Sequence, residues 1–547
     1  MADQIDIVLP ILPVPPEPDS KTFDPEMEAF LRALEKYQSK QADWTAQANA
    51  LAVSVSNDAA LAEQDAMDAE AAAASAGGAA DEATAARDTT LAARDTAAAA
   101  ALTATGQAEA AAASAALAGQ YAQQTGVMQA MRDTLGVFPG VEPPTLNLFC
   151  GNATGDTVPL GTFARSTVGT RRGPTGIVET VAAGVIRREW DADGELLGWL
   201  IEEQRTNNIP YSEDFANAAW AKNRTTIVAN AATAPDGNVT ADKLVETTAA
   251  DNSHNAFYTI YNLTAGETYT FSVFIQAAER QTAALVVNNN GAFPLALFDI
   301  ATGIVLSNSG SLIPKIEKYQ DGWFRCSVSF VLQTVDNVGV FISLIEKTEL
   351  ELLQTYTGDG TSGFYVWGAQ FEEGPTPSSY IQTTGATATR AEDSWLIEKG
   401  AFPFSYPNFS LYISYSQFGA NKIEYSMAAS FGQYPSLISV SDYGEANGYG
   451  KQIVVANAGA STALPLGDSV KNESTRIVAS LNGDKISAST NGGETMSLNG
   501  ATQPPYASFT YFGVGGTLGG NRLNGHVRHL AYFPYPLMDD TLPAITA

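Results

Sequence analysis

The chain has 547 residues, with 59 acidic against 30 basic side chains, a formal net charge of −29 and a sequence pI of about 4.4. This acidity argues against nucleic acid and anionic membrane surfaces as partners, because both repel a strongly negative protein. The sequence contains no run of about 18 apolar residues, so no membrane insertion is expected. Its length predicts three or four folding units rather than a single core.

The first segment, residues 1–25, alternates aliphatic residues with prolines. Proline blocks both helices and central strands, so this segment is expected to be extended. It lacks the basic end and apolar run of a signal peptide, which indicates synthesis in a cytoplasm without standard export. We interpret it as a docking segment, with a disordered tail as the alternative. The side chains that would gain from burial on a partner are Ile5, Ile7, Leu9, Ile11 and Val14.

A long alanine-rich helical pattern covers residues 26–138. Within it, 27–55 and 117–138 repeat apolar residues at the 3.5-residue spacing of a left-handed coiled coil. Alanine favours helix but buries little area, so such a helix is marginal alone and is expected to pack against copies of itself. The pattern predicts a parallel homotrimeric coiled-coil stalk. Gly77-Gly78 interrupts it and leaves a kink, a stutter or a hinge open.

The rest of the chain is predicted to be β-structure in three parts. Residues 139–206 are a small β-rich connector that either stands alone or completes the following sandwich. Residues 207–392 show the two-residue alternation and turn signals of a β-sandwich, and 393–547 show those of a second one. The predicted fold class is therefore α then β: a long Ala-rich trimeric coiled-coil stalk followed by antiparallel β-sandwich (jelly-roll) modules.

Residue types that carry enzyme chemistry are sparse in this sequence. His526 and His529 are three apart in a strand-like segment and are expected on opposite faces, which does not suit one metal ion. There is no nucleophile elbow, P-loop or dinucleotide fingerprint. Two cysteines in different predicted domains indicate neither a disulfide framework nor a zinc site, and Cys326 reads as a buried free thiol. We expect no enzyme activity, no cofactor and no metal.

Aromatic residues make up 10% of the chain and concentrate in the predicted β-modules. Exposed aromatic rings stack on the apolar faces of sugars, while nearby polar side chains bind the hydroxyls. For each residue the alternative is a structural role in a core or a subunit interface. The candidate carbohydrate-binding residues are Trp220, Tyr258, Tyr261, Tyr434, Tyr443 and Tyr449.

Several motifs resemble those of bacteriophage tail-fibre and head-spike proteins. Residues 197–223 (LGWLIEEQRTNNIPYSEDFANAAWAKN) are similar to a signature of that family, and 319–325 and 366–381 are similar to its carbohydrate-binding-like jelly roll. More weakly, 476–484 and 525–546 resemble a concanavalin A or laminin-G type sandwich. The resemblance implies a structural role for its characteristic residues: Arg205 and Glu202 as a buried pair, and Trp367 in the core.

The function implied by this resemblance is that of a phage virion fibre, made in the host cytoplasm. It would be a homotrimer that binds bacterial surface polysaccharide or lipopolysaccharide without catalysis through its C-terminal β-modules. Its N-terminal segment would dock on a phage tail adaptor or on a capsid protein. The alternatives are a capsid-anchored head fibre, a polysaccharide depolymerase, and a structural spacer without a ligand.

Overall fold

In a computed structural model, the described part of the chain is residues 141–547 without 154, 251–252, 334–336, 347–354, 419–425, 434–435, 443–449, 469–472 and 517–521, together with Phe138 and scattered positions between 46 and 107. The chain divides into two units, Met1–Glu142 and Pro143–Ala547.

The predicted fold class is wrong for the described residues, which are almost entirely β-structure. Within 26–138 only single positions are described, and the α-helix with defined bounds in the described part is the short α3, Leu542–Thr546. No long coiled-coil helix is found among these residues, and no described helix is long and apolar enough to span a membrane. Apolar spacing and alanine content report helix propensity, but a stable stalk also needs buried area, which an alanine seam supplies poorly. The predicted docking segment 1–25 and Gly77-Gly78 lie outside the described residues.

Strands β8 to β19 form a sandwich of two six-stranded antiparallel sheets, which we call the inserted sandwich. One sheet has the order β16-β17-β12-β19-β10-β9, with bounds Ile313–Lys318, Trp323–Val331, Thr268–Ala277, Gly363–Glu373, Ala241–Glu246 and Thr225–Ala232. The other has the order β15-β14-β13-β18-β11-β8, with bounds Ile304–Asn308, Leu295–Asp299, Thr282–Asn288, Asn337–Leu344, His254–Tyr261 and Ala221–Asn223.

A second sandwich, which we call the base sandwich, combines strands from both ends of the unit. Its eight-stranded sheet has the order β29-β28-β27-β22-β31-β6-β5, with β1 also on β31, and bounds Met496–Leu498, Lys485–Thr490, Thr475–Asn482, Phe409–Gln417, Gly525–Phe533, Leu196–Ile201, Arg187–Trp190 and Leu146–Phe149. Its seven-stranded sheet has the order β2-β21-β30-β23-β24-β25-β26, with bounds Thr162–Ala164, Ser394–Glu398, Tyr511–Val514, Ser426–Gln433, Ser436–Asp442, Lys451–Asn457 and Ala460–Pro465.

Short elements complete the unit. A hairpin of β3 (Gly169–Arg172) and β4 (Val178–Val181) precedes β5. The 3-10 helices of the described chain span Cys150–Asn152, Gln320–Gly322, Lys399–Ala401 and Tyr506–Ser508.

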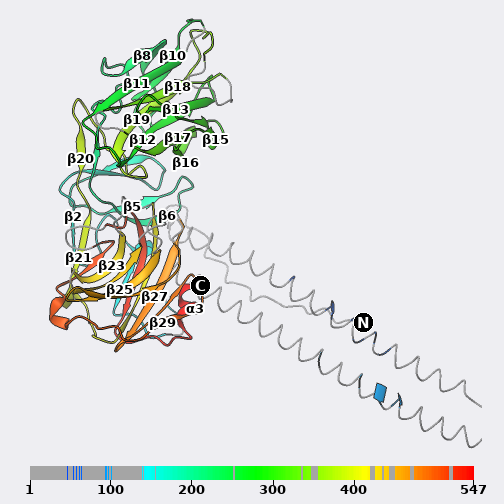
Figure 1. The fold of residues 1–547 in the computed structure, drawn as a ribbon, viewed down its shortest axis with the longest axis vertical. Helices are drawn as coiled ribbons and strands as arrows, with labels where there is room; N and C mark the ends of the chain where they lie inside the picture. The colour runs from blue at the N-terminus through cyan, green and yellow to red at the C-terminus, as the bar shows by residue number, and fades with distance from the viewer. Residues whose placement is uncertain are drawn as a thin grey trace, which may run out of the picture. The chain divides into compact units, whose positions relative to one another are not determined.

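The inserted sandwich interrupts the base sandwich in sequence. In Figure 1 the cyan strands β5 and β6 lie beside the yellow to red strands that follow the insertion, while the green strands form the other sandwich. The cores are separate: one draws on 209–371, the other on 146–201 and 395–532. The chain crosses between them through a two-stranded neck, in which β7 (Arg205–Asn207) pairs with β20 (Ala388–Arg390). Residues of the predicted connector therefore complete the base sandwich.

Strand β12 shows why the alternating pattern predicts the inserted sandwich well. Tyr269, Phe271, Val273 and Ile275 all lie in its core, as the two-residue period of a strand requires. Phe274 on the opposite face is buried as well. It belongs to a smaller apolar cluster in which the β3–β4 hairpin takes part through Val178, alongside Trp323, Trp367 and Tyr380.

Both cysteine thiols are free and buried, so the expectation for Cys326 is confirmed. Cys150 lies in the base core and Cys326 in the inserted core, so they are not placed to form a disulfide. Burial raises the pKa of Cys150 to about 12 and also raises that of Cys326. We predict that neither thiol reacts with a chromogenic disulfide reagent in the native protein at pH 8, and that both react in about 6 M urea. Fast labelling of the native protein would contradict this burial.

Candidate functional site

The described aromatic candidates differ widely in their exposure to solvent. Trp220 is 1% exposed, packs against Phe215 and Tyr258 in the inserted core and donates from Nε1 to the Tyr211 carbonyl at 2.9 Å. Tyr258 is half-buried, and Tyr261 at the end of β11 is 64% exposed. These three side chains therefore do not gather on one exposed surface. The other candidates, Tyr434, Tyr443 and Tyr449, lie outside the described residues.

A network of buried charges fastens the neck to the base sandwich. Asp393, which precedes β21, accepts hydrogen bonds from Arg165 Nη1 at 3.1 Å and Arg187 Nη2 at 2.5 Å. Glu202, which follows β6, lies 2.8 Å from Arg187 Nη2 and 3.5 Å from Arg390 Nε. All five side chains are buried. Because every charge is engaged with another, we interpret this network as structural, although Glu202 also lines the crevice described below.

The signature segment supplies further parts of the same neck. Arg205 is buried beside Glu203, and its Nε lies 4.0 Å from Glu372 Oε2. The resemblance implied a pair of Arg205 with Glu202, but the structure gives these two residues different partners. They are three positions apart in extended chain, so their side chains leave on opposite sides. The predicted core role of Trp367 is confirmed.

The two histidines of β31 point to the same face of the sheet, contrary to the expectation. The partner strand β22 places Ser414 opposite His529 and Ser416 opposite His526, with a register shift between them. The bulge adds one residue to the spacing, which restores a common face. Their partners differ: His529 Nε2 binds Asn147 Oδ1 and His526 Nε2 binds Glu189 Oε2, each at 2.7 Å. Among the described residues, no group of histidine, cysteine and acidic side chains is arranged to hold a metal.

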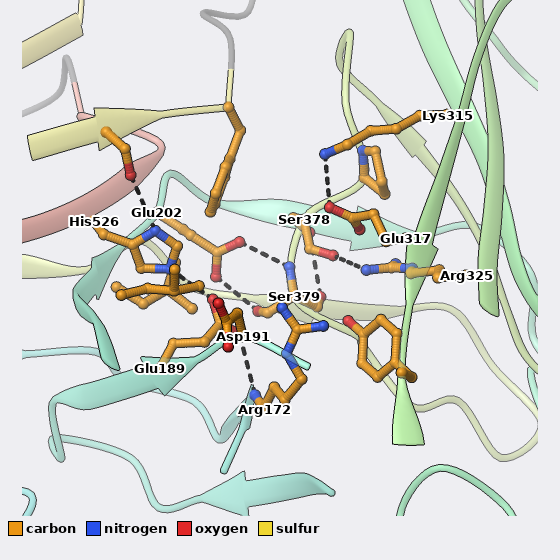
Figure 2. Close-up of a pocket in the computed structure, with 16 residues that line it drawn as sticks. Arg172, Glu189, Asp191, Glu202, Lys315, Glu317, Arg325, Ser378, Ser379 and His526 are labelled. Carbon is orange, nitrogen blue, oxygen red and sulfur yellow. Dashed lines mark hydrogen bonds and ion pairs between the residues drawn. The ribbon is translucent and has the colours of Figure 1, made fainter. Parts of the chain in front are cut away.

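A polar crevice of about 320 Å³ lies where the two sandwiches meet. Strands of the base sandwich and the β3–β4 hairpin form one side, and β16, β17 and residues 377–379 of the inserted part form the other. Figure 2 shows His526 and Glu189 on one side, facing Lys315, Glu317 and Arg325 across the opening. The crevice depends on the contact between both sandwiches, because each contributes only part of its lining.

On the base side, hydrogen bonds hold the polar groups in place. His526 Nε2 donates to Glu189 Oε2, while the other carboxylate oxygen accepts from the Arg172 backbone N–H at 3.1 Å. The Arg172 guanidinium donates to the carbonyls of Trp190 and Lys318 at 2.7 and 3.0 Å. Asp191 uses Oδ1 to accept two backbone N–H groups of its own turn. No hydrogen bond of its second oxygen, Oδ2, is found among the described residues.

On the inserted side, Lys315 Nζ lies 2.7 Å from Glu317 Oε1, and both side chains are partly exposed. The Arg172 guanidinium stacks 4.6 Å from the centre of the Tyr319 ring. No hydrogen bond of the Tyr319 hydroxyl is present among the described residues. Burial raises the pKa of this phenol, so the hydroxyl stays protonated and can donate. Arg325 is buried and donates to the Ser378 carbonyl and to Ser272 Oγ at 2.7 and 3.0 Å.

Sequence reasoning found this site only indirectly. Tyr319 and Arg325 lie in one of the segments quoted for the resemblance, but Arg172, Glu189 and Glu317 were not singled out. These residues come from separate strands, and no local spacing signals that they meet. The one available signal was the Tyr-Gln-Asp-Gly turn at 319–322, where Asp321 adopts a left-handed backbone with φ of 55°.

The buried carboxylates predict a stability that falls in acid. Burial alone would raise the pKa of both Glu189 and Glu202. The hydrogen bond and charge of His526, together with Arg172, lower the pKa of Glu189 overall. The charges of Arg390 and Arg187 and the hydrogen bonds from Ser379 lower the pKa of Glu202 overall. The unfolded chain therefore takes up protons first, and this stabilisation is lost as the pH falls below about 5. The urea midpoint should drop between pH 6 and pH 4, with a smaller drop in Glu202→Gln. An equal drop in both proteins would contradict this assignment.

No protein-family model matches the chain, and no curated protein matches it significantly. Solved structures that it resembles include Trypanosoma rangeli sialidase with the inhibitor DANA, at 11% identity, a TM-score of 0.21 and coverage of 57% of this chain and 67% of that one. Another is the CBM22-1-CBM22-2 tandem domain of Paenibacillus barcinonensis Xyn10C, at 9% identity and a TM-score of 0.21, with coverage of 61% of this chain and 99% of that one. A third is domains LG4-5 of the mouse laminin alpha1 chain, at 9% identity and a TM-score of 0.17, with coverage of 51% of this chain and 86% of that one. The chain spans about two thirds or less of the two first sialidase structures. These likenesses assign the chain to no family.

Proposed function

We propose that the protein is a non-catalytic glycan-binding component of a phage virion, which attaches the particle to bacterial surface polysaccharide or lipopolysaccharide. The observation that carries this proposal is the crevice between the two sandwiches, which contains both hydrogen-bond donors and acceptors without a partner in the described part of the chain. Asp191 Oδ2 and the second carboxylate oxygen of Glu317 offer acceptors, and the Tyr319 hydroxyl offers a donor. Sugar hydroxyls both donate and accept, so this mixture suits them.

The state of the carboxylates supports binding without chemistry. A glycosidase of the common type needs one carboxylic acid whose pKa is raised, so that it can protonate the leaving group, and a second ionised carboxylate. In the crevice, burial acts to raise the pKa of Glu189, Glu202 and Glu317, but neighbouring cations and hydrogen bonds lower it overall. The crevice therefore offers three carboxylates held ionised and no protonated acid among them.

The virion part of the proposal is supported by the resemblance of 197–223 and 366–381 to phage fibre and spike proteins. Residues 1–25 would then anchor the protein on a tail adaptor or a capsid protein through their aliphatic side chains. A chain without these residues should be missing from purified particles and should still bind glycan. Normal incorporation of that shortened chain would place the anchor elsewhere. A homotrimer stays a prediction, which sedimentation of the full chain tests.

The binding proposal is tested with arrayed surface polysaccharides and lipopolysaccharides of candidate host bacteria. Tyr319→Ala should weaken binding at least tenfold, because the residue lines the crevice and its ring packs against Arg172 of the opposite side. Tyr511→Ala, which removes an exposed tyrosine on β30, is the matched control and should bind normally. Tyr261→Ala addresses the aromatic candidate from the sequence. Loss of binding in that variant alone would move the site to the end of β11.

Enzyme activity and a purely structural role are the competing functions. Incubation with a bound polysaccharide should release no reducing ends and leave its chain length unchanged. Release of oligosaccharides would show a depolymerase instead. Absence of binding to every surface glycan and to host cells would favour a structural spacer.

A further inference from the structure

We infer that the crevice accepts an uncharged, hydroxyl-rich sugar residue and rejects sugars that carry a carboxylate. This inference rests on the proposed glycan binding and names the class of ligand for the same site. It follows from the number of charged groups in the lining, from how each is already engaged, and from the size of the space.

Acidic groups outnumber the permanent cations in the lining. The lining contains Glu189, Asp191, Glu202 and Glu317 against Arg172, Lys315 and Arg325, and Glu202 is paired with Arg187 and Arg390 behind it. A ligand carboxylate would add a fifth negative charge to a half-enclosed space, where screening by water is weaker than on an open surface. An uncharged sugar adds none.

The cations are also committed to partners within the protein. The Lys315 ammonium lies 2.7 Å from Glu317. The Arg172 guanidinium donates to two carbonyls and covers the Tyr319 ring, and the buried Arg325 is held by Ser378 and Ser272. Recognition of a carboxylate commonly uses the paired donors of an arginine. Arg172 already uses Nε and Nη1 in these bonds, and Arg325 already uses Nη1 and Nη2.

The dimensions favour a small part of a glycan. A volume of about 320 Å³ is at the lower end of the range of ligand pockets, roughly 300–1,000 Å³. The space therefore suits one or two sugar rings rather than a long segment. Because the lining comes from both sandwiches, a bound sugar would contact both and stabilise their docking.

The carboxylates of the lining are held in their ionised form. Burial would raise the pKa of Glu317, but the charge and hydrogen bond of Lys315 outweigh it. Glu189 and Glu202 are lowered as described above. The lining thus keeps its negative charge at the pH of ordinary binding experiments.

The test compares two panels of oligosaccharide probes on the full chain by calorimetry. One panel contains neutral hexoses and N-acetylhexosamines, and the other contains hexuronic or sialic acids. Wild-type protein should bind members of the neutral panel and raise its melting temperature with them, and should bind acidic probes at least tenfold more weakly. Tyr319→Phe should weaken neutral binding severalfold, because only the free hydroxyl is removed.

A gain-of-function variant should bind acidic sugars. Glu317→Gln keeps the side-chain size, removes one negative charge and leaves Lys315 available, so affinity for acidic probes should rise on the order of tenfold. Glu279→Gln removes the carboxylate of a similar pair, 2.7 Å from Lys243 on the inserted sandwich, and should change neither panel. Equal or preferential binding of acidic probes by the wild type would overturn this inference while leaving glycan binding intact. Unchanged probe selectivity in Glu317→Gln would also overturn it. Absence of binding to both panels would overturn the proposed function itself.

Discussion

Removing residues 208–387 and joining Asn207 to Ala388 with an Asn-Gly turn should leave a base sandwich that folds cooperatively. These two residues are directly opposite each other in the neck. Antiparallel partners are about 5 Å apart, so a two-residue turn converts the neck into an ordinary hairpin. The base core uses 146–201 and 395–532 and takes no side chain from the removed part. The shortened chain, 143–207 plus 388–547, should show one sharp thermal transition by circular dichroism.

The fragment 393–547 alone should not fold. It lacks β1, β5 and β6 of the eight-stranded sheet, and with them six core side chains: Leu146, Leu148, Cys150, Ile186, Trp199 and Ile201. The Trp199 ring, for example, packs edge-on against the Trp395 ring, with the two ring centroids 5.0 Å apart. Losing six buried apolar side chains costs on the order of 10 kcal/mol, which is comparable to the whole stability of a domain. A cooperative transition of 393–547, or none in the shortened chain, would contradict the insertion.

Asp393→Ala should be among the most destabilising single substitutions in the described chain. The Asp393 carboxylate is fully buried and neutralises the guanidinium groups of Arg165 and Arg187. It also accepts the backbone N–H of Glu202 at 2.9 Å. Removing one partner of a buried ion pair costs about 3–5 kcal/mol, because the remaining charge stays buried without compensation. The loss should appear as a lower urea midpoint of the base sandwich.

The matched control is Asp539→Ala, which breaks a single ion pair of 2.5 Å with Lys485 in a more exposed setting. The two side chains of that pair are 38% and 45% exposed. Exposed pairs contribute about 0–1 kcal/mol, so the urea midpoint should move little. Similar losses in both variants would show that the Asp393 network contributes no more than a surface pair.

Local pattern predicted the β-modules because alternation is a property of neighbouring residues. The alternating side chains of β12 lie in the core, and Trp367 and Cys326 are buried as expected. What local pattern did not supply was long-range pairing. Nothing near Leu146 indicates that its partner is Tyr532, and the charge network of Asp393 joins three distant segments. The crevice went unrecognised for the same reason, since its groups meet only when the two sandwiches dock.

Two further errors have local causes. The bulge in the β22–β31 pairing moved His526 and His529 onto one face, because bulges are not visible in residue spacing. No long coiled-coil helix is found in the described part of the chain, and the stalk was inferred from alanine content and heptad spacing, which measure the tendency to form a helix and not the area that a stalk buries.

The interrupted base sandwich has a consequence for synthesis on the ribosome. His529 binds Asn147, a residue 382 positions earlier in the chain, across the pairing of β31 with β1. At about 5–20 residues per second, roughly 20 to 80 seconds separate the emergence of these two strands. The inserted sandwich, whose core lies within 209–371, is complete well before β31 appears. During that interval β1, β5 and β6 present unpaired edges, and a chaperone that shields extended segments would find its substrate there.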